Sequence, residues 1–121
     1  MLKPALYVLA AYQLGIGLFM AVAPGPFFEA VGPYGVRNDH YTRDMASWEL
    51  ALGIAAVVAV SRPAWRVPVL GIAAVHFALH SANHLLDIGE AVPRAVGHAA
   101  FVSLLLGTAV LAVLWRRAGR A

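Results

Sequence analysis

Four apolar segments, each about as long as a bilayer crossing, dominate this chain of 121 residues. A helix needs about 20 residues to cross the hydrocarbon core, because each residue advances it by about 1.5 Å. The segments cover residues 4–23, 44–61, 67–87 and 95–115. Inside a bilayer the backbone must satisfy its own hydrogen bonds, so such segments fold as helices. We therefore predict an all-α integral membrane four-helix bundle, with residues 1–121 as a single transmembrane domain.

The composition agrees with a membrane protein and excludes several kinds of site. Hydrophobic residues make up 61% and charged residues 12%, which is too little charge for an ordinary soluble domain. Cysteine is absent, which excludes disulfide exchange, c-type haem attachment, thiolate metal sites and iron–sulfur ligation. The net charge of +3 does not indicate nucleic-acid binding, because the basic residues lie at the ends of the predicted spans, beside the membrane surface.

The longest connection covers residues 24–43. Its aromatic side chains favour the headgroup layer, so we expect an ordered outer loop that lies on the membrane surface. Asn38 or Asp44 is suited to cap the second span. The small side chains before Pro24 resemble a signal-peptide cleavage site. However, the apolar run before them is longer than a usual signal sequence, and proline would follow the cut, so we interpret residues 4–23 as a span.

The charge distribution predicts the orientation of the bundle. With four spans, one side of the membrane carries basic residues and no acidic ones. The positive-inside rule then places the N- and C-termini in the cytoplasm and the long loop outside. We expect a multi-pass protein of the bacterial cytoplasmic (inner) membrane. The basic residues of the predicted cytoplasmic side are Lys3, Arg62, Arg66, Arg116, Arg117 and Arg120.

The third span carries a row of polar side chains. His76, His80 and His84 recur every four residues. At about 100° per residue they occupy one sector of a helix, and Asn83 and Asp87 fall in the same sector. Polar side chains within a span need partners, water or a ligand. The row therefore predicts one wall of a pocket.

The other spans place polar residues at similar depth, in the outer half of the bundle. Glu49 lies about 7 Å inside the second span, as judged from a rise of about 1.5 Å per residue. His98 begins the fourth span near the level of the outermost histidine, and Gln13 lies near the middle of the first span. Trp48 is placed to line the same pocket. Arg43, at its mouth, is an alternative partner for Glu49 or a contact for an anionic headgroup.

Our first hypothesis is that this pocket binds a ligand. A divalent metal is one candidate, because two histidines four residues apart present both imidazoles on one helix face. A b-type haem held by His84 and His98, or a quinone-like headgroup, is the alternative. The candidate metal ligands are His80, His84, Glu49, Asp87 and His98, and the candidate ligand-binding residues are Gln13, Trp48, His76, Asn83 and Arg43.

Two other hypotheses belong to different functional classes. In one, the protein is an enzyme that acts on a lipidic substrate, and Glu49, His80 and His84 are catalytic groups that exchange protons in an isomerisation or hydrolysis. In the other, the protein is an accessory or structural subunit, and the polar cluster only holds the helices together. The expected partners are the lipid bilayer, a lipidic small molecule, and further copies of the chain or a larger membrane complex, without nucleic acid.

Glycines within the spans predict where helices approach each other closely. A residue without a side chain lets two helix backbones come together inside a membrane. On this basis we expect close packing at Gly15 and Gly17 in the first span, at Gly53 in the second and at Gly71 in the third.

The order of these features resembles the DoxX-like group of small four-helix bacterial membrane proteins. The resemblance rests on Arg43 and Asp44 after the first loop and on the sequence WELALG at residues 48–53, and it covers nearly the whole chain. It implies a four-helix membrane bundle and a link with quinone- or thiosulfate-dependent redox complexes, with which some members are associated. The histidines of the third span lie outside the pattern of that group.

Overall fold

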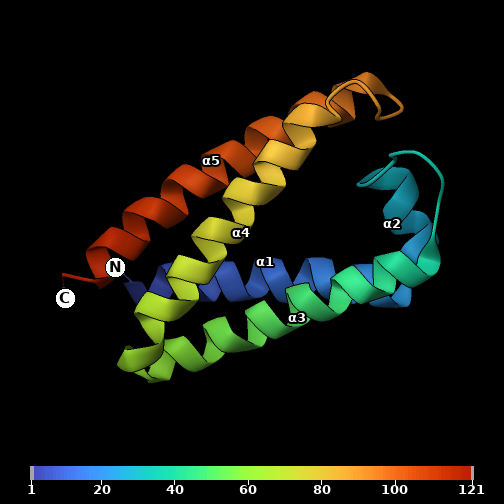
Figure 1. Cartoon of the computed structure of the whole chain (residues 1–121). Helices are drawn as coiled ribbons and strands as arrows, with labels where there is room; N and C mark the ends of the chain where they lie inside the picture. Colours follow the sequence, from blue (N-terminus) through green and yellow to red (C-terminus); the bar gives the residue numbers. More distant parts are fainter. Residues whose placement is uncertain (1, 121) are drawn as a thin grey trace.

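The computed structural model describes residues 2–120 and confirms an all-helical fold (Figure 1). Within this range no strand forms, and the only β-type pairing is an isolated bridge between Tyr34 and Ala91. Four helices are long and apolar enough to cross a membrane, and the third is preceded by a short 3-10 helix. The elements are α1 (Leu2–Val22), α2 (Pro24–Ala30), α3 (Asp39–Ser61), η1 (Pro63–Trp65), α4 (Arg66–Leu86) and α5 (Arg94–Ala118).

The second long helix, α3, begins at Asp39 rather than at residue 44. Asn38 caps it, because its side-chain oxygen accepts a hydrogen bond from the backbone N–H of Tyr41 at 3.1 Å. Asp39 in the first turn adds a negative charge beside the positive end of the helix dipole. Asn38 rather than Asp44 is therefore the cap, and only residues 31–38 of the predicted loop lie outside helices.

The connection over residues 31–38 is anchored by an exposed ion pair. The Arg37 side chain donates two hydrogen bonds to the carboxylate of Asp39, at 2.6 and 2.9 Å. The hydrogen bond to Asp39 raises the pKa of the Arg37 guanidinium above its ordinary value. The guanidinium lies over Gly25 in α2, where an added Cβ would come within 2.7 Å of it. A larger residue at position 25 would require the Arg37 side chain to shift.

The four long helices form two hairpins that diverge from one end of the molecule (Figure 1). α1 packs along α3, and α4 packs along α5, whereas α3 and α4 share a smaller contact. Both termini and η1 lie where the hairpins meet, and we name this the η1 end. The opposite end, which holds α2 and the two long connections, is the loop end. There the Val92 N–H donates to the Pro33 carbonyl at 3.2 Å, which ties the hairpins together again.

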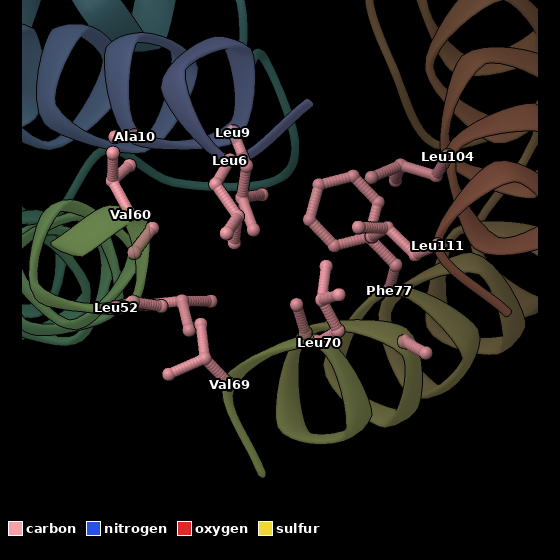
Figure 2. Close-up of a cluster of buried hydrophobic side chains, with 14 residues drawn as sticks. Leu6, Leu9, Ala10, Leu52, Val60, Val69, Leu70, Phe77, Leu104 and Leu111 are labelled. Carbon is pink, nitrogen blue, oxygen red and sulfur yellow. The ribbon is translucent and has the colours of Figure 1, made fainter. Parts of the chain in front are cut away.

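The apolar core occupies the half of the bundle toward the η1 end. Figure 2 shows side chains from all four long helices meeting there, and Leu6 and Leu70 are fully buried. Within a membrane, close packing and dispersion hold such a cluster together, because lipid is as apolar as leucine. The cluster contains Leu6, Leu9, Ala10, Leu52, Ala56, Ala59, Val60, Val69, Leu70, Ala73, Ala74, Phe77, Leu104 and Leu111.

The outward faces of the long helices are also apolar. Leu86, for example, is 83% exposed, and Val8 and Val22 are exposed on α1. In water so much exposed apolar surface would promote aggregation, whereas in a bilayer it contacts lipid. This surface and the four candidate spans indicate a multi-pass membrane protein.

α1 and α3 approach each other closely at two glycines. A Cβ added at Gly17 or at Gly53 would lie 3.0 Å from a backbone nitrogen of the facing helix. Gly71 is a third close contact, because the ring of Trp115 lies 2.9 Å from the same point. These three predictions are confirmed. The prediction for Gly15 is wrong, since nothing lies within 4 Å of an added Cβ there.

We expect Gly53→Ala to lower the free energy of unfolding by about 1–3 kcal/mol, because the methyl group would force the α1 backbone away from α3. The measurement is unfolding in mixed detergent micelles with increasing sodium dodecyl sulfate, followed by tryptophan fluorescence. Gly15→Ala is the matched control, and its effect should stay within about 0.5 kcal/mol. Equal losses in the two variants would contradict close packing at Gly53.

Candidate functional site

The three histidines of α4 form a continuous row that runs toward the loop end. The ring centroids of His76 and His80 lie 5.5 Å apart, and those of His80 and His84 lie 4.8 Å apart. The Nε2 atoms of His80 and His84 are 3.1 Å apart, which is hydrogen-bonding distance. The predicted row is therefore present, and its members contact one another rather than standing separately on the helix.

Glu49 of α3 contacts the row at His76, the member farthest from the loop end. Its side chain is 8% exposed, and its Oε1 lies 3.3 Å from Nε2 of His76. A carboxylate at such depth costs several kcal/mol unless it is protonated or paired. Of the two partners considered from the sequence, His76 is therefore the one that Glu49 contacts, whereas Arg43 is exposed. Gly17 brings α1 against this point, since an added Cβ there would lie 3.1 Å from Glu49 Cβ.

Tyr34 meets the row at the opposite end, and the sequence analysis did not predict it as a site residue. Its hydroxyl lies 2.8 Å from Nδ1 of His84, and the two rings pack edge to face at 5.0 Å. The bridge to Ala91 holds Tyr34 in place. Burial raises the pKa of the Tyr34 phenol above its ordinary value of 10.0, and the negative charge of Asp87 adds to the effect.

Gln13 lies in the interface between α1 and α3. Its side chain is fully buried, and within residues 2–120 neither atom of its amide group has a hydrogen-bond partner. It lies one turn before Gly17, and so on the face of α1 that packs against α3. An unpaired buried amide costs about 1–3 kcal/mol. The bundle interior near Glu49 therefore retains unused hydrogen-bonding capacity.

A groove of about 520 Å³ runs along α4 and is open to the bilayer side. This volume is typical of small-molecule sites. Trp48, whose ring centroid lies 5.5 Å from that of His76, flanks one end, and Trp115 lies over Gly71 near the other. Apart from the His76 imidazole and the two indole N–H groups, the side chains of the wall are apolar. The lining residues are Trp48, Val67, Pro68, Gly71, Ile72, Val75, His76, Leu79 and Trp115.

The groove has the proportions of a site for an elongated molecule. Its wall on α4 runs from Val67 to Leu79, a distance of about 18 Å at 1.5 Å per residue. It begins near the η1 end and reaches His76 in the middle of α4. This length and the apolar lining are suited to an apolar tail, and His76 places one imidazole in the wall.

The metal centre expected from the sequence is not supported by the structure. Within residues 2–120 no three His, Asp or Glu side chains are grouped so that they could hold a metal ion. Asp87 follows the last residue of α4 and is exposed, as is Asn83. His98 is exposed on α5, and its Nδ1 donates to the Arg94 carbonyl at 3.0 Å. A sector of about 100° covers more of the helix surface than the histidine row occupies. Asn83 and Asp87 can therefore share that sector with the histidines and still be exposed.

The structure does not bring together the two histidines expected to hold a b-type haem. His84 engages Tyr34 with one ring nitrogen and His80 with the other. His98 is exposed and bonded to its own helix. Both expected axial ligands are thus directed toward other partners.

No protein-family model, curated protein or solved structure matches this chain.

We expect Tyr34→Phe to weaken the loop end without changing its packing. Loss of the hydrogen bond to His84 should lower the free energy of unfolding by about 1 kcal/mol. Because the folded-state pKa of Tyr34 is raised, its contribution is complete below pH 10.0 and is lost as the pH rises through the folded pKa. The stability difference between wild type and variant, measured by unfolding at several pH values, should therefore shrink above pH 10.0.

Tyr41→Phe is the matched control, because this ring is 68% exposed on α3. It should leave both the stability and its pH dependence unchanged. A Tyr34→Phe variant as stable as wild type at neutral pH would show that the hydroxyl contact contributes nothing to the fold.

Proposed function

We propose that the protein binds a lipid-soluble, quinone-like molecule whose tail lies in the groove along α4 and whose ring headgroup lies against His76. One observation carries the proposal: the groove is apolar along its length and, near one end, contains a histidine that is backed by a buried carboxylate. Sites for small molecules combine a mostly apolar wall with a few placed polar groups in this way.

The position of His76 favours a small uncharged headgroup. α4 runs from Arg66 to Leu86, so His76 lies ten residues from either end. At about 1.5 Å per residue this is about 15 Å from each membrane surface. A charged phospholipid headgroup would be desolvated at that depth. A ring with carbonyl or hydroxyl groups loses less, can accept or donate a hydrogen bond at the imidazole, and can stack on Trp48.

The same geometry argues against the enzyme hypothesis. His80 and His84 do not line the groove, and Glu49 stands behind His76. A substrate in the groove would therefore touch only one of the three groups expected to exchange protons. The structural hypothesis accounts for the Glu49–His76 pair, which joins α3 to α4, but it gives no role to the groove.

We further propose that both termini face the cytoplasm of a bacterial inner membrane and that the chain is DoxX-like. The grouping of both termini at the η1 end supports the orientation, since the predicted cytoplasmic basic residues lie in the same parts of the chain (Figure 1). The link of some DoxX-like proteins with quinone-dependent complexes agrees with the proposed ligand. The expected protein partner is such a complex or a further copy of this chain.

The binding test uses tryptophan fluorescence of the protein in lipid nanodiscs, titrated with a benzoquinone that carries a decyl tail. Quinones quench nearby indoles, so we expect saturable quenching of Trp48 and Trp115. The third tryptophan, Trp65, does not line the groove. The double variant Trp48→Phe/Trp115→Phe should therefore lose the saturable component and keep only the linear quenching caused by quinone dissolved in the lipid.

A pair of matched substitutions locates the site. Val75→Phe places a ring inside the groove and should weaken binding by at least about tenfold, which corresponds to about 1.4 kcal/mol. Val110→Phe makes the same change outside the groove, at a position of similar exposure, 59% against 51% for Val75, and should leave binding unchanged. Equal affinity of the two variants for the quinone would overturn the proposal.

The orientation is tested with single cysteines, because the chain has none of its own. Val36→Cys lies in the exposed connection between α2 and α3, and Gly119→Cys lies just after α5. In intact cells with a permeabilised outer membrane, an impermeant maleimide should label Val36→Cys and not Gly119→Cys. Labelling of Gly119→Cys should require lysis of the inner membrane, and the reverse pattern would overturn the proposed orientation.

A further inference from the structure

We propose that Tyr34, His84, His80, His76 and Glu49 form a proton path from the loop end of the bundle to the groove, so that the ligand is one whose headgroup takes up or releases a proton. This inference rests on the proposed function, because the groove is where the proton is used. The class that fits is a tailed phenol or hydroquinone and its deprotonated or oxidised partner.

The path is built from short contacts between groups that both donate and accept protons. The Tyr34 hydroxyl lies 2.8 Å from His84 Nδ1, and His84 Nε2 lies 3.1 Å from His80 Nε2. At the deep end, His76 Nε2 lies 3.3 Å from Glu49 Oε1. Between these two segments, the ring centroids of His76 and His80 lie 5.5 Å apart, so proton transfer between them requires one ring to rotate about its Cβ–Cγ bond.

The outer segment can exist in two hydrogen-bond directions. In the first, the Tyr34 O–H donates to His84 Nδ1, and the Nε2–H of His84 donates to His80 Nε2. In the second, His80 Nε2–H donates to His84, and His84 Nδ1–H donates to the Tyr34 oxygen. A neutral imidazole has one donor and one acceptor nitrogen, so both directions keep the Tyr34–His84 and His84–His80 contacts hydrogen-bonded. A proton path needs hydrogen bonds whose donor and acceptor can exchange, and this segment has them.

Passage of one proton converts the first direction into the second. The Tyr34 proton moves to His84 Nδ1, the His84 Nε2 proton moves to His80 Nε2, and the Nδ1 proton of His80 moves to His76. Tyr34 regains a proton from water at the loop end. His76 then holds the extra proton as an imidazolium beside the Glu49 carboxylate, where a headgroup in hydrogen-bond reach takes it. Release from the headgroup runs through the same steps in reverse.

Few titratable groups outside the row face it. Within residues 2–120 the one ion-pair partner of Glu49 is His76. The other titratable groups that face the row are Tyr12 on α1, which is near enough to feel the Glu49 charge, and Asp87 beside Tyr34. Beyond Glu49 toward the η1 end lies the apolar core (Figure 2). The path therefore ends at the groove and does not cross the membrane.

The test follows the protonation of a coloured ligand in the groove. A 2-nitrophenol with a dodecyl tail is bound to the protein in phosphatidylcholine nanodiscs, and a laser flash releases protons from a caged acid. The loss of phenolate absorbance gives the protonation rate. In His84→Phe this rate should fall by at least about tenfold, because a positioned acid or base typically contributes about 10²–10⁴-fold. The dissociation constant, from quenching of Trp48 and Trp115, should not change, because His84 does not line the groove.

Two further variants keep the test decisive. Tyr34→Phe retains the ring but removes the first proton donor, so it should slow protonation even if His84→Phe does not fold. His98→Phe removes an exposed histidine outside the row and should leave the rate at the wild-type value. Vesicles containing the wild-type protein should show no transmembrane proton leak above protein-free vesicles.

The possible results separate the two proposals. Saturable binding with equal protonation rates in wild type, His84→Phe and Tyr34→Phe would overturn the proton path and leave the groove as a binding site. Absence of saturable quenching by the tailed nitrophenol and by the tailed quinone would overturn the proposed function itself. A proton leak that His84→Phe abolishes would replace a path that ends at the groove with a transmembrane one.

Discussion

The contact between Glu49 and His76 is the interaction on which the two halves of this bundle depend. An ionised carboxylate inside a bilayer must find a partner, because lipid offers none. Glu49 belongs to the hairpin of α1 and α3, and His76 belongs to the hairpin of α4 and α5. The pair therefore spans the diverging interface at the point where the apolar core ends. Loss of either group would leave the other buried without its partner, which is generally worse than replacing both by apolar side chains.

The bundle is divided along its length into two regions held together by different forces. Toward the η1 end, leucine, valine and alanine side chains from all four long helices pack against one another (Figure 2). Toward the loop end, polar contacts and the bridge between Tyr34 and Ala91 hold the chain together. Hydrogen bonds inside a membrane contribute about 0.6–2 kcal/mol each. The loop end is therefore the part more easily opened, and it is also where the proposed proton path begins.

The sequence predicted the features that depend on periodicity and length. Apolar runs of about 20 residues identified the four long helices, and a four-residue repeat identified the histidine row. Depth counting placed Glu49 at the level of His80 to His84, whereas the structure pairs it with His76, one turn deeper. It also matched His98 to the level of Asp87, and the structure leaves both of these side chains exposed. Depth along a helix fixes only one coordinate. Which way each side chain faces depends on how the helices rotate and diverge, and one sequence does not determine that.

Tyr34 and the groove could not be predicted for a related reason. Tyr34 reaches His84 only because a non-helical connection folds back over the loop end, and its composition is that of any interfacial loop. The groove forms where Gly71 lets the ring of Trp115 lie on α4, although Gly71 itself predicted only close packing. In both cases the deciding contact joins residues far apart in the chain: Tyr34 and His84 are separated by 50 positions, and Gly71 and Trp115 by 44.

The groove and the histidine row meet only at His76. In the proposed function, this arrangement separates binding of the tail from transfer of the proton. The sequence analysis placed a single polar pocket in the outer half, but the groove extends from His76 toward the η1 end. With the proposed orientation, a bound tail lies in the cytoplasmic half of the membrane and the headgroup lies at its centre. In the proposed proton path, protons enter from the opposite half, through the row. A ligand held in this way exchanges protons with the outer side while its tail stays in the inner half. Such a site gives the headgroup a proton source of defined sidedness without opening a route across the membrane.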